Sequence, residues 1–384
     1  MTSQNLGNVL VRSDLNVPIS NGIISDNYRI IKSIENFDKL EKISKNITFI
    51  SHLGRPNGID SSLSLKPVAD EMSKLLGRDV TFIKNNTEND IEKILKNNKK
   101  AILLLENLRF NEGELSNDNK FAKNLAKPFD NYILDAFGAA HREHASIVSI
   151  GNHLKSYQGS LMSKELFELD KVLNGNKDDF TMIIGGAKVS DKLELIRNIL
   201  PRVNSLLIGG GMCFTFLKAL GHNIGKSLCE DDLVNSAKEI LDSKEGKKIK
   251  LPIDFGVTKS IDNHDRVNID LIEFNDDDIG VDIGSKTIYK FNKLLSSSNA
   301  IFWNGPMGIF EVDEFSYGTK EITRTIAELN AHTIVGGGDS VNAINKFSSF
   351  DKFNHVSTGG GASLEYLEGK KLPGVNIYNQ LIIE

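Results

Sequence analysis

Several features that often identify a protein class are absent from this sequence. Only two cysteines, Cys213 and Cys229, occur among 384 residues, and their spacing matches no metal or redox motif. We therefore predict two free thiols in a reducing compartment. No uncharged apolar stretch is long enough to cross a bilayer, and no basic segment followed by a long apolar one opens the chain. We expect no membrane span and no secretory signal, and hence a cytoplasmic protein.

Positive charge is not in excess either. The chain has 46 Lys and Arg against 51 Asp and Glu, a formal net charge of −5. A nucleic acid held through many phosphate contacts is therefore not an expected partner. An anionic substrate would have to be attracted by a local cluster of cations.

Familiar nucleotide-binding motifs are missing as well. No glycine cluster completes G-x-G-x-x-G, because Phe214, Val341 and Leu364 stand where the last glycine is needed. The stretch "GHNIGKS" (221–227) resembles a P-loop but is one residue short and follows a helix-like segment. We interpret Gly221 as the end of that helix. A P-loop ATPase is thus disfavoured. A nicotinamide oxidoreductase is kept as an alternative, although the sequence lacks the glycine fingerprint of that class.

The sequence does contain a regular alternation of short apolar runs and helix-like segments. Many runs are continuously apolar, which is typical of parallel strands buried on both faces. With 384 residues, this alternation predicts an α/β fold with two domains and mostly parallel sheets flanked by helices. We place the domains at 1–158 and 159–369, with a helix and polar loop over 160–179 as their connection. The runs are VLVRSDLNVP (9–18), ITFISHLGRP (47–56), AILLLENLRF (101–110), NYILDAFGAAHREH (131–144), MIIGGAKVS (182–190), LLIGGGMCF (206–214), AIFWNGPMG (300–308), TIVGGGDSV (333–341) and FNHVSTGGGAS (353–363).

In the first half, cations fall at or just after the strand-like runs. Ligands of open α/β sheets gather at the carboxyl ends of strands, and the planar fork of arginine matches carboxylate and phosphate oxygens. A small ligand with both groups would hold such cations together. Two alternatives are surface arginines in weak ion pairs and a metal site at His141 and His144, although no third ligand completes a zinc pattern. The cations are Arg12, Arg29, His52, Arg55, Arg109, His141 and Arg142.

In the second half, the strand-like runs end in glycines, which permit left-handed turns and close approach to a ligand. Lys188 and Lys192 follow the first cluster, one helical turn apart. An anion between them would relieve their repulsion, but two solvated lysines are an equal alternative. The clusters are Gly185–186, Gly209–211, Gly336–338 and Gly359–361, and the predicted helical face is Val189, Leu193, Ile196 and Leu200.

The run TIVGGGDSVNAI (333–344) places Asp339 directly after three glycines. A carboxylate would repel a phosphate in this turn unless a divalent cation lay between them, and Mg²⁺ is often held by one or two carboxylates together with substrate phosphates. The alternative is that Asp339 or Ser340 only caps the following helix. A small anion on one domain and a magnesium nucleotide on the other predict phosphoryl transfer, with domain closure to exclude water.

Taken together, these motifs resemble the phosphoglycerate kinase family, in the family's order and over essentially the whole chain. The resemblance implies reversible phosphoryl transfer between ATP and 3-phosphoglycerate in glycolysis, with Mg²⁺. It also implies two Rossmann-like domains joined by a hinge, a monomer, and a C-terminal tail (370–384) that returns to the first domain. The motifs are RSDLNVP (12–18), SHLGRP (51–56), LLENLRF (104–110), DAFGAAHREHAS (135–146), GGAKVSDKL (185–193), GGGMCFTFL (209–217), WNGPMGIFE (303–311), GGGDS (336–340) and STGGGASLEYLEG (357–369).

The resemblance also implies roles for individual residues. Phosphoglycerate would be held by Asp14, Asn16, Arg29, His52, Arg55, Arg109, His141 and Arg142. The nucleotide would be held by Lys192, Gly280, Glu311, Gly337, Gly338, Asp339 and Ser340. Glu311 would meet the ribose and Asp339 the magnesium. Arg29, Lys188 and Lys192 would be the catalytic group, with Arg29 and Lys188 steadying the phosphoryl group in flight.

Five positions depart from the family pattern, and none of them removes a charged catalytic group. Tyr28 and Ala139 concern the fine geometry of substrate binding, because each replaces a threonine. A nonenzymatic relative is a further alternative, which the presence of Arg29, Lys188 and Asp339 disfavours. The departures are Ser13, Leu15, Tyr28, Ala139 and Ser285.

Overall fold

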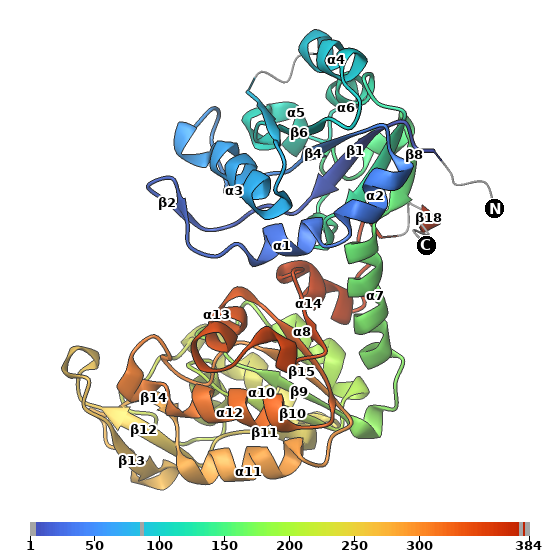
Figure 1. The fold of residues 1–384 in the computed structure, drawn as a ribbon. Coiled ribbons are helices and arrows are strands. Elements are labelled where there is room, and N and C mark those ends of the chain that lie inside the picture. Colours follow the sequence, from blue (N-terminus) through green and yellow to red (C-terminus); the bar gives the residue numbers. More distant parts are fainter. Residues whose placement is uncertain (1–4, 85–87, 376–378, 381–384) are drawn as a thin grey trace. The chain divides into compact units, whose positions relative to one another are not determined.

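The structure is a computed structural model that describes residues 5–84, 88–375 and 379–380 (Figure 1). The chain forms two compact units, Met1–Leu166 with Lys371–Glu384, and Phe167–Lys370. The division falls inside helix α7 (Ser160–Leu173), within the segment 160–179 that the sequence indicated as a connection.

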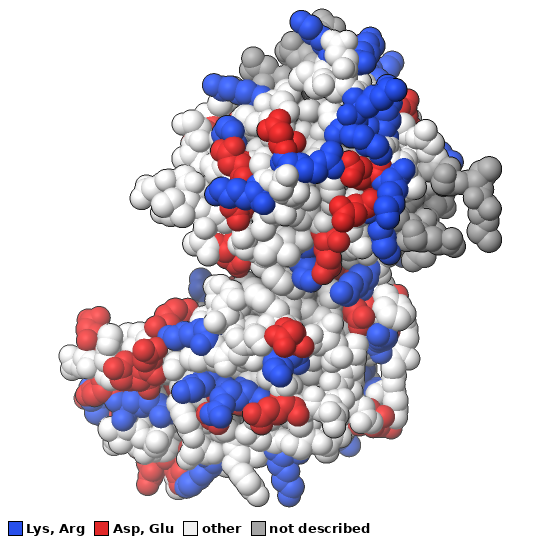
Figure 2. All heavy atoms as spheres, viewed as in Figure 1, with Lys and Arg blue, Asp and Glu red and all other residues white. Residues whose placement is uncertain are grey.

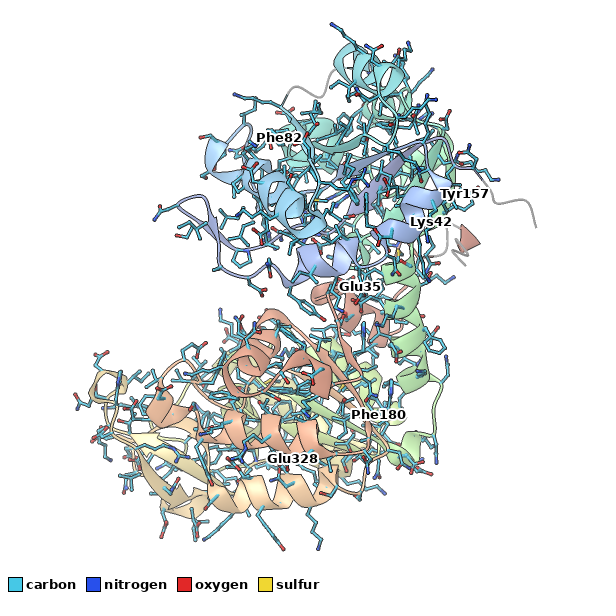
Figure 3. The ribbon with its side chains drawn as sticks, viewed as in Figure 1. Glu35, Lys42, Phe82, Tyr157, Phe180 and Glu328 are labelled. Carbon is cyan, nitrogen blue, oxygen red and sulfur yellow. The ribbon has the colours of Figure 1, made fainter. Side chains whose placement is uncertain are left out.

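The first unit is built on a parallel sheet, as predicted for the first half of the chain. Its strand order is β18-β8-β7-β1-β4-β6-β5. Strand β1 pairs with β4 on one side and with β7 on the other, and it is almost entirely buried. The strand order therefore changes direction at β1. Tyr157 on β8 and Phe82 on β5 lie toward opposite ends of this strand order (Figure 3). The strands are β1 (Asn8–Ser13), β4 (Asn46–Ile50), β5 (Thr81–Ile83), β6 (Ile102–Leu105), β7 (Asn131–Asp135), β8 (Lys155–Gln158) and β18 (Asn379–Gln380).

Helices of this unit begin and end where local chemistry allows. Helix α3 has a proline in its first turn and ends at Gly77, whose φ of 62° is left-handed. Helix α6 begins after Asp118, whose carboxylate accepts a hydrogen bond from the Phe121 N–H at 2.5 Å. The helices are α1 (Tyr28–Ile34), α2 (Phe37–Ile43), α3 (Lys66–Leu76), α4 (Glu88–Asn97), α5 (Glu112–Leu115) and α6 (Asn119–Ala126).

The C-terminal segment belongs to this first unit. The Gly374 N–H donates to the Ala140 carbonyl at 2.8 Å, and Leu372 is buried. Strand β18 then pairs in parallel with β8. The remainder of the tail predicted at 370–384, namely 376–378 and 381–384, lies outside the described residues.

The second unit contains a second parallel sheet, again as predicted. Its order is β11-β10-β9-β15-β16-β17, with the first strand, β9, between β10 and β15. Phe180, labelled in Figure 3, begins β9, and Trp303 on β15 is fully buried. The strands are β9 (Phe180–Ile184), β10 (Ser205–Ile208), β11 (Ile249–Lys250), β15 (Ala300–Asn304), β16 (His332–Gly336) and β17 (His355–Val356).

The helices of this unit include the one predicted to end at Gly221. Helix α9 stops there because Gly221 has a φ of 85° and the His222 N–H donates back to the Leu217 carbonyl at 3.1 Å. That prediction is confirmed. The helices are α8 (Leu193–Ile199), α9 (Cys213–Ala219), α10 (Val234–Asp242), α11 (Ser285–Leu295), α12 (Tyr317–Glu328), α13 (Gly338–Phe347) and α14 (Gly361–Leu367).

Two antiparallel elements were not predicted. Strands β12 (Asp254–Thr258), β13 (Val267–Asp270) and β14 (Ile279–Ile283) form a separate sheet in the second unit. Strands β2 (Ile19–Ser20) and β3 (Ile23–Ile24) form a small hairpin in the first. Strands β2 and β3 have only two residues each, and β13 contains no buried residue, so these strands lack the apolar run by which a buried strand is predicted.

The surface agrees with the weak net charge. On the face shown in Figure 2, Lys and Arg side chains are interspersed with Asp and Glu over each unit. Within the described part of the chain, no helix combines the length and the apolarity that a bilayer crossing requires. Both cysteines are free thiols, as expected, with Cys213 buried and Cys229 partly exposed.

Candidate active site

Predicted site residues of the first unit follow the carboxyl ends of three adjacent strands. Asp14 comes after β1, His52 after β4, and His141 and Arg142 after β7. Strand β1 pairs with β4 on one side and with β7 on the other. The loops after these three strands therefore lie at the point where the strand order changes direction. Such a switch point is the usual ligand site of an open α/β sheet.

Arg12 lies beneath this group and does not belong to its open face. Its guanidinium is fully buried and donates from Nε to Ser146 Oγ at 3.1 Å. Its Nη2 lies 2.9 Å from Nδ1 of His52. Because arginine can only donate, Nδ1 of His52 accepts and Nε2 carries the ring proton. The sequence grouped Arg12 with the ligand-facing cations, whereas the structure makes it the group that orients His52.

The same network contains a buried acid that the sequence did not indicate. Glu114, on the four-residue helix α5, is fully buried. Its carboxylate accepts hydrogen bonds from Ser146, at 2.6 Å from Oγ and 3.0 Å from N. Glu114 therefore balances part of the charge of Arg12 through Ser146. No pattern in the sequence could have found it, because a single glutamate on a short helix has no periodic neighbour.

Arg109 has buried polar atoms that lack partners. Its Nη1 donates to the Gly54 carbonyl at 2.5 Å, but Nε and Nη2 are buried and have no hydrogen-bond partner among the described residues. Burial, Arg142 and Arg12 lower the pKa of Arg109 to about 10, so it is still a cation near neutral pH. Buried cations with unsatisfied donors are costly, and an anion placed between them would remove that cost.

The pKa values of the nearby histidines reflect the same excess of positive charge. Burial and Arg142 lower the pKa of His141 to about 4, and burial with Arg109 and Arg142 does the same for His144. For His52, burial and Arg12 hold the pKa well below 6.5. All three rings are therefore neutral near pH 7.

The metal alternative for His141 and His144 finds no support in this environment. Arg109 and Arg142 both act on the two rings and lower their pKa values, and a bound cation would be repelled by these guanidinium groups. Among the described residues, no group of three or more His, Cys, Asp or Glu side chains could hold a metal ion.

Arg29 reaches the cluster from helix α1. Its Nη1 lies 2.9 Å from Asp14 Oδ2 and 3.4 Å from the Asn16 carbonyl. Asn16 in turn accepts a hydrogen bond from the Gly54 N–H at 2.9 Å through its side chain. Asp14 and Asn16 therefore hold Arg29 and the loop after β4 in place, while Arg29 keeps 30% of its side chain exposed.

The alternative of scattered surface arginines fits only one member of the set, Arg55, which is exposed. Arg12 and Arg109 are buried, and Arg29 and Arg142 are partly buried. The structure leaves Arg55 exposed and brings together the other predicted residues of this site, namely Asp14, Asn16, Arg29, His52, Arg109, His141 and Arg142.

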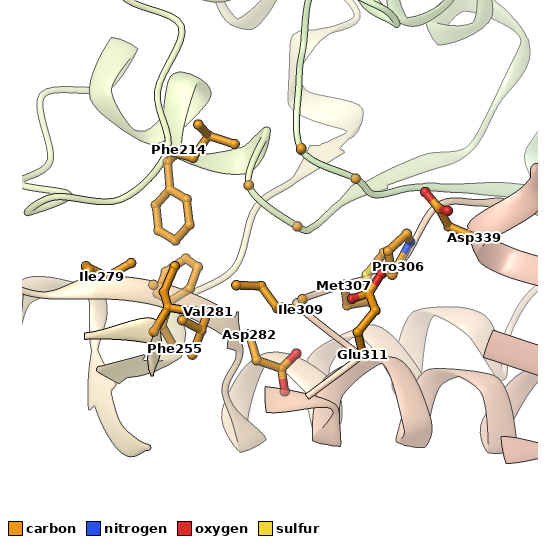
Figure 4. Close-up of a pocket in the computed structure, with 18 of the residues that line it drawn as sticks. Phe214, Phe255, Ile279, Val281, Asp282, Pro306, Met307, Ile309, Glu311 and Asp339 are labelled. Carbon is orange, nitrogen blue, oxygen red and sulfur yellow. The ribbon is translucent and has the colours of Figure 1, made fainter. Parts of the chain in front are cut away.

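The second unit has a pocket of about 480 Å³, a size typical of small-molecule sites. Three predicted nucleotide residues line it: Gly280, Glu311 and Asp339. Apolar side chains Phe214, Phe255, Ile279 and Val281 gather at one end, and the carboxylates of Glu311 and Asp339 lie at the other (Figure 4). One end therefore suits an apolar ring and the other a polar or cation-bound group.

The glycine clusters have two different uses. Gly186, Gly210 and Gly211 line the pocket. At Gly185, however, an added Cβ would lie 1.9 Å from the Pro306 carbonyl oxygen, and at Gly210 it would lie 2.6 Å from the Gly186 nitrogen. Several glycines are thus required so that the loops after β9, β10 and β15 can pack backbone against backbone.

The turn after β16 leaves Asp339 available for a ligand. Helix α13 begins at Gly338, and its N-cap is Gly337, with a φ of 94° and no side-chain cap. The capping alternative for Asp339 and Ser340 is therefore wrong. Asp339 is exposed in the first turn and faces the pocket, while Ser340 is buried and its Oγ accepts from the Gly305 N–H at 2.6 Å.

The donor set at this turn fits a magnesium ion carried by a nucleotide. One exposed carboxylate, Asp339, stands beside a helix N-terminus whose first N–H groups are left open by Gly337 and Gly338. Nothing lies within 4 Å of a Cβ added at Gly338. A single carboxylate cannot make a complete cage, but it is sufficient when phosphates and water supply the other ligands.

The two lysines do not share a helix, and that prediction is wrong. Helix α8 begins only at Leu193, with Lys192 as its N-cap, and Lys188 lies in the preceding irregular loop. Val189, placed on the predicted helical face, is buried but also precedes the helix. In this loop the carboxylate of Glu230, from a distant segment of the same unit, accepts the N–H groups of Val189 and Ser190.

Lys192 points back into the glycine turns. Its Nζ donates to the Gly185 carbonyl at 2.6 Å and lies 3.4 Å from that of Asn304. Burial lowers the pKa of Lys192 to about 8, against the opposing effect of Asp339. The alternative of two solvated lysines therefore fails for Lys192, while Lys188 is exposed.

The apolar wall of the pocket was not predicted from the sequence. Phe255 and Val281 come from the unpredicted sheet of β12 and β14. Phe214, from α9, packs on Phe255 with ring centroids 5.0 Å apart. In the sequence, Phe214 was distinguished only because it interrupts a glycine motif. Its place in the pocket wall depends on strands that are distant in sequence.

Fold and site together define an α/β protein with a site for a compact anion in one unit and a nucleotide-sized pocket in the other. A family model described as phosphoglycerate kinase matches residues 4–370. Phosphoglycerate kinases of Finegoldia magna and Dictyoglomus turgidum are 47% and 46% identical, covering 97% and 96% of this chain and 96% and 94% of their own. The chain belongs to the phosphoglycerate kinase family.

Solved structures agree. The phosphoglycerate kinase from Coxiella burnetii superposes with a TM-score of 0.86 at 35% identity, over 98% of this chain and 97% of that one. The enzyme from Pyrococcus horikoshii gives 0.86 at 31% identity, over 98% and 96%. The family consists of phosphotransferases with a carboxyl group as acceptor and acts in glycolysis.

Proposed function

We propose that this chain catalyses the family reaction, reversible transfer of a phosphoryl group between ATP and the carboxylate of 3-phosphoglycerate, giving ADP and 1,3-bisphosphoglycerate. The observation that carries this proposal is the contrast between two sites in one chain. One is a cluster of cations with unsatisfied donors on Arg109, and the other is a pocket with an apolar end and an acidic end.

The first unit binds 3-phosphoglycerate through its cation cluster. Arg109 and Arg142 supply guanidinium groups, and neutral His52 and His141 add ring N–H donors. Asp14 and Asn16 act on the ligand's hydroxyl side and hold Arg29, whose distance to Asp14 is 2.9 Å. Arg55, which is exposed, joins once the ligand is bound.

The second unit binds the nucleotide. Its base lies at the end formed by Phe214 and Phe255, against the backbone of Gly280. Glu311 meets the ribose, and the phosphates lie along the first turn of α13, from Gly337 to Ser340. This arrangement uses backbone N–H groups for the phosphates, as a helix N-terminus commonly does.

Catalysis depends on neutralising the charge of the transferring group. Arg29 from one unit and Lys188 and Lys192 from the other supply that charge. No general base is required, because the acceptor carboxylate is already ionised near neutral pH. Lys192 becomes fully charged when phosphates approach, since an anion raises its pKa from about 8.

Asp339 would hold the Mg²⁺ that accompanies the nucleotide, and the ion would supply further neutralisation of the phosphate oxygens. The residues of this chain orient the phosphates, with the open N–H groups after Gly337 on one side and Lys192 on the other. Asp339 and Lys192 are close enough for Asp339 to influence the pKa of that lysine.

The two units close on each other during the reaction, so that the ligands come in line and water is excluded. X-ray scattering should show a smaller radius of gyration with both ligands present than with either alone, and an unchanged radius would contradict closure. We further propose that the protein is a cytoplasmic monomer with no nucleic-acid partner, in keeping with its net charge of −5.

The direct test is a coupled assay of ADP formation with ATP, Mg²⁺ and 3-phosphoglycerate. Turnover that requires all three supports the proposal. Nucleotide binding measured by calorimetry without any turnover would instead identify a nonenzymatic relative. Binding of NAD in place of ATP would favour an oxidoreductase.

A further inference from the structure

One motif noted in the sequence has no part in the proposed reaction. The incomplete P-loop, "GHNIGKS" (221–227), follows α9, and the chain continues from it to Glu230; Lys226 and Leu228 of this segment line the nucleotide pocket. Its backbone is tied to the start of β14, because the Lys226 N–H donates to the Asp278 carbonyl at 2.7 Å. Ser227 Oγ accepts the Gly280 N–H at 2.8 Å. The segment is therefore an anchored wall of the pocket.

The last residue of this segment reaches across to the loop after β9. Glu230 Oε2 accepts hydrogen bonds from two successive N–H groups, Val189 at 2.5 Å and Ser190 at 2.9 Å. Its own N–H donates to Thr215 Oγ1 at 3.2 Å. Thr215 is buried on helix α9, so Glu230 links the loop to an ordered element.

The loop that Glu230 holds carries Lys188. Between the end of β9 at Ile184 and the start of α8 at Leu193, the chain has no regular secondary structure. The Lys188 side chain is exposed, whereas the next residue, Val189, is fully buried. The buried valine and the two hydrogen bonds to Glu230 determine the direction in which the backbone presents Lys188.

The contact is present over the whole physiological pH range. Burial acts to raise the pKa of Glu230, but hydrogen bonds from Ser190 and Val189 and the charge of Lys188 outweigh it and hold that pKa below its usual value. Glu230 is therefore ionised near neutral pH. Charge-assisted hydrogen bonds of this kind are stronger than neutral ones.

We propose that Glu230 is a positioning residue of the nucleotide site, which orients the 187–190 loop so that Lys188 meets the transferring phosphoryl group. The inference rests on the proposed function, since it assigns Lys188 its target. Glu230 is not among the residues that line the nucleotide pocket, so it would act through the loop and not on the nucleotide. A displacement of about 1 Å at a reacting group can reduce the rate by about 100-fold, so a small shift of this loop is sufficient to matter.

The test is a double-mutant cycle of Glu230→Ala and Lys188→Ala, with kcat and both KM values measured for all four proteins. In the unaltered background, Glu230→Ala should lower kcat by about 10- to 100-fold and leave the KM for phosphoglycerate unchanged. In the Lys188→Ala background, it should lower kcat by less than about threefold, because residues that act as a unit are not additive. Glu230→Gln, which retains an acceptor oxygen, should recover most of the activity.

The matched control is Glu239→Gln, which removes an exposed carboxylate of the same unit that pairs with Arg197 and should not change kcat. A readout independent of catalysis is trypsin cleavage after Lys188, followed by mass spectrometry. Cleavage should be several-fold faster in Glu230→Ala than in the control, even if the proposed reaction proves wrong.

Two outcomes would overturn the inference. Equal losses of kcat in both backgrounds would show that Glu230 supports the unit in general. An unchanged kcat in folded Glu230→Ala would show that the loop needs no anchor. If Glu230→Ala does not fold, Glu230→Asp replaces it under the same criteria, because its shorter carboxylate cannot reach both N–H groups. Absence of turnover in the unaltered chain refutes the proposed function, and the cleavage rates still decide whether Glu230 holds the loop.

Discussion

The two units solve the problem of binding an anion in opposite ways. In the first unit, charged side chains converge at the ends of β1, β4 and β7, and the excess of positive charge is large enough to help lower the pKa of His141 to about 4. In the second, Gly186, Gly210 and Gly211 line the pocket without side chains, and Lys192 lies against carbonyl oxygens. The difference follows from what each site must bind.

A compact anion offers few atoms, so a site for it must concentrate formal charge. A nucleotide offers a base and a sugar as well, so much of its binding can come from apolar contact, and its phosphates can be held by N–H groups. The first site should therefore be sensitive to loss of charge. The second should be sensitive to loss of space.

The largest effect should come from Arg29→Ala. The arginine is held by Asp14 at 2.9 Å and should act on the phosphoryl group in the transition state, a role that can contribute about 1,000-fold or more in rate. We expect kcat to fall on that order while the KM for phosphoglycerate rises much less. Arg78→Ala, which removes an exposed arginine of the same unit paired with Glu41, is the control. A large rise in KM at unchanged kcat would place Arg29 in ground-state binding.

Asp339→Asn should have the next largest effect, confined to the second site. Loss of groups that only support metal ligands costs about 10- to 100-fold in metal affinity, so loss of the carboxylate itself should raise the Mg²⁺ concentration for half-maximal rate at least as much. The KM for phosphoglycerate should not change. Undiminished activity at limiting Mg²⁺ would contradict the assignment.

Gly280→Ala tests whether the second site depends on space. The added Cβ would lie 2.1 Å from Cζ of Phe214, whose ring is packed on Phe255 and cannot move freely. We expect the KM for ATP to rise about tenfold, since overpacking typically costs about 1–3 kcal/mol. Adding Phe214→Leu should recover part of the ATP binding by making room, and the remainder should stay lost with the ring that the base contacts. Equal losses for ATP and phosphoglycerate would mean that the change disturbs more than this pocket.

The smallest effect concerns the histidines of the first site. Their folded-state pKa values lie below the unfolded value of about 6.5, at about 4 for His141 and His144. The unfolded chain thus binds more protons between these limits, so the free energy of unfolding should fall as pH falls from 6.5 toward 4. Urea denaturation at pH 7, 6 and 5 measures this, and added phosphate should lessen the loss. Imidazole signals that titrate near 6.5 by NMR would rule it out.

The parts that the sequence predicted are those encoded by near neighbours. Nine apolar runs were predicted, and each overlaps a strand of one of the two parallel sheets. The end of helix α9 at Gly221 was also correct. In each case the signal is a run of residues buried on both faces or one glycine in a left-handed turn, and neither depends on distant parts of the chain.

The failures share a different cause. The spacing of Lys188 and Lys192 matched a helix, but Lys188 lies in a loop whose Val189 and Ser190 N–H groups donate to Glu230, 40 or more residues away. Arg12 was predicted to face the ligand because it is a cation at a strand end. It is buried instead, and it orients the ring of His52. A contact between segments far apart in sequence has no period to detect.

Local chemistry along the chain is enough to specify the α/β class, the parallel strands and the placement of cations and glycines at strand ends, because strand burial and turn formation involve near neighbours. Which of those residues meet is a property of the folded chain. Examples are the neutral donor state of His52 set by Arg12, the apolar wall of Phe214 and Phe255, and the anchoring of the Lys188 loop by Glu230. Each of them depends on burial and on distances between segments that folding brings together.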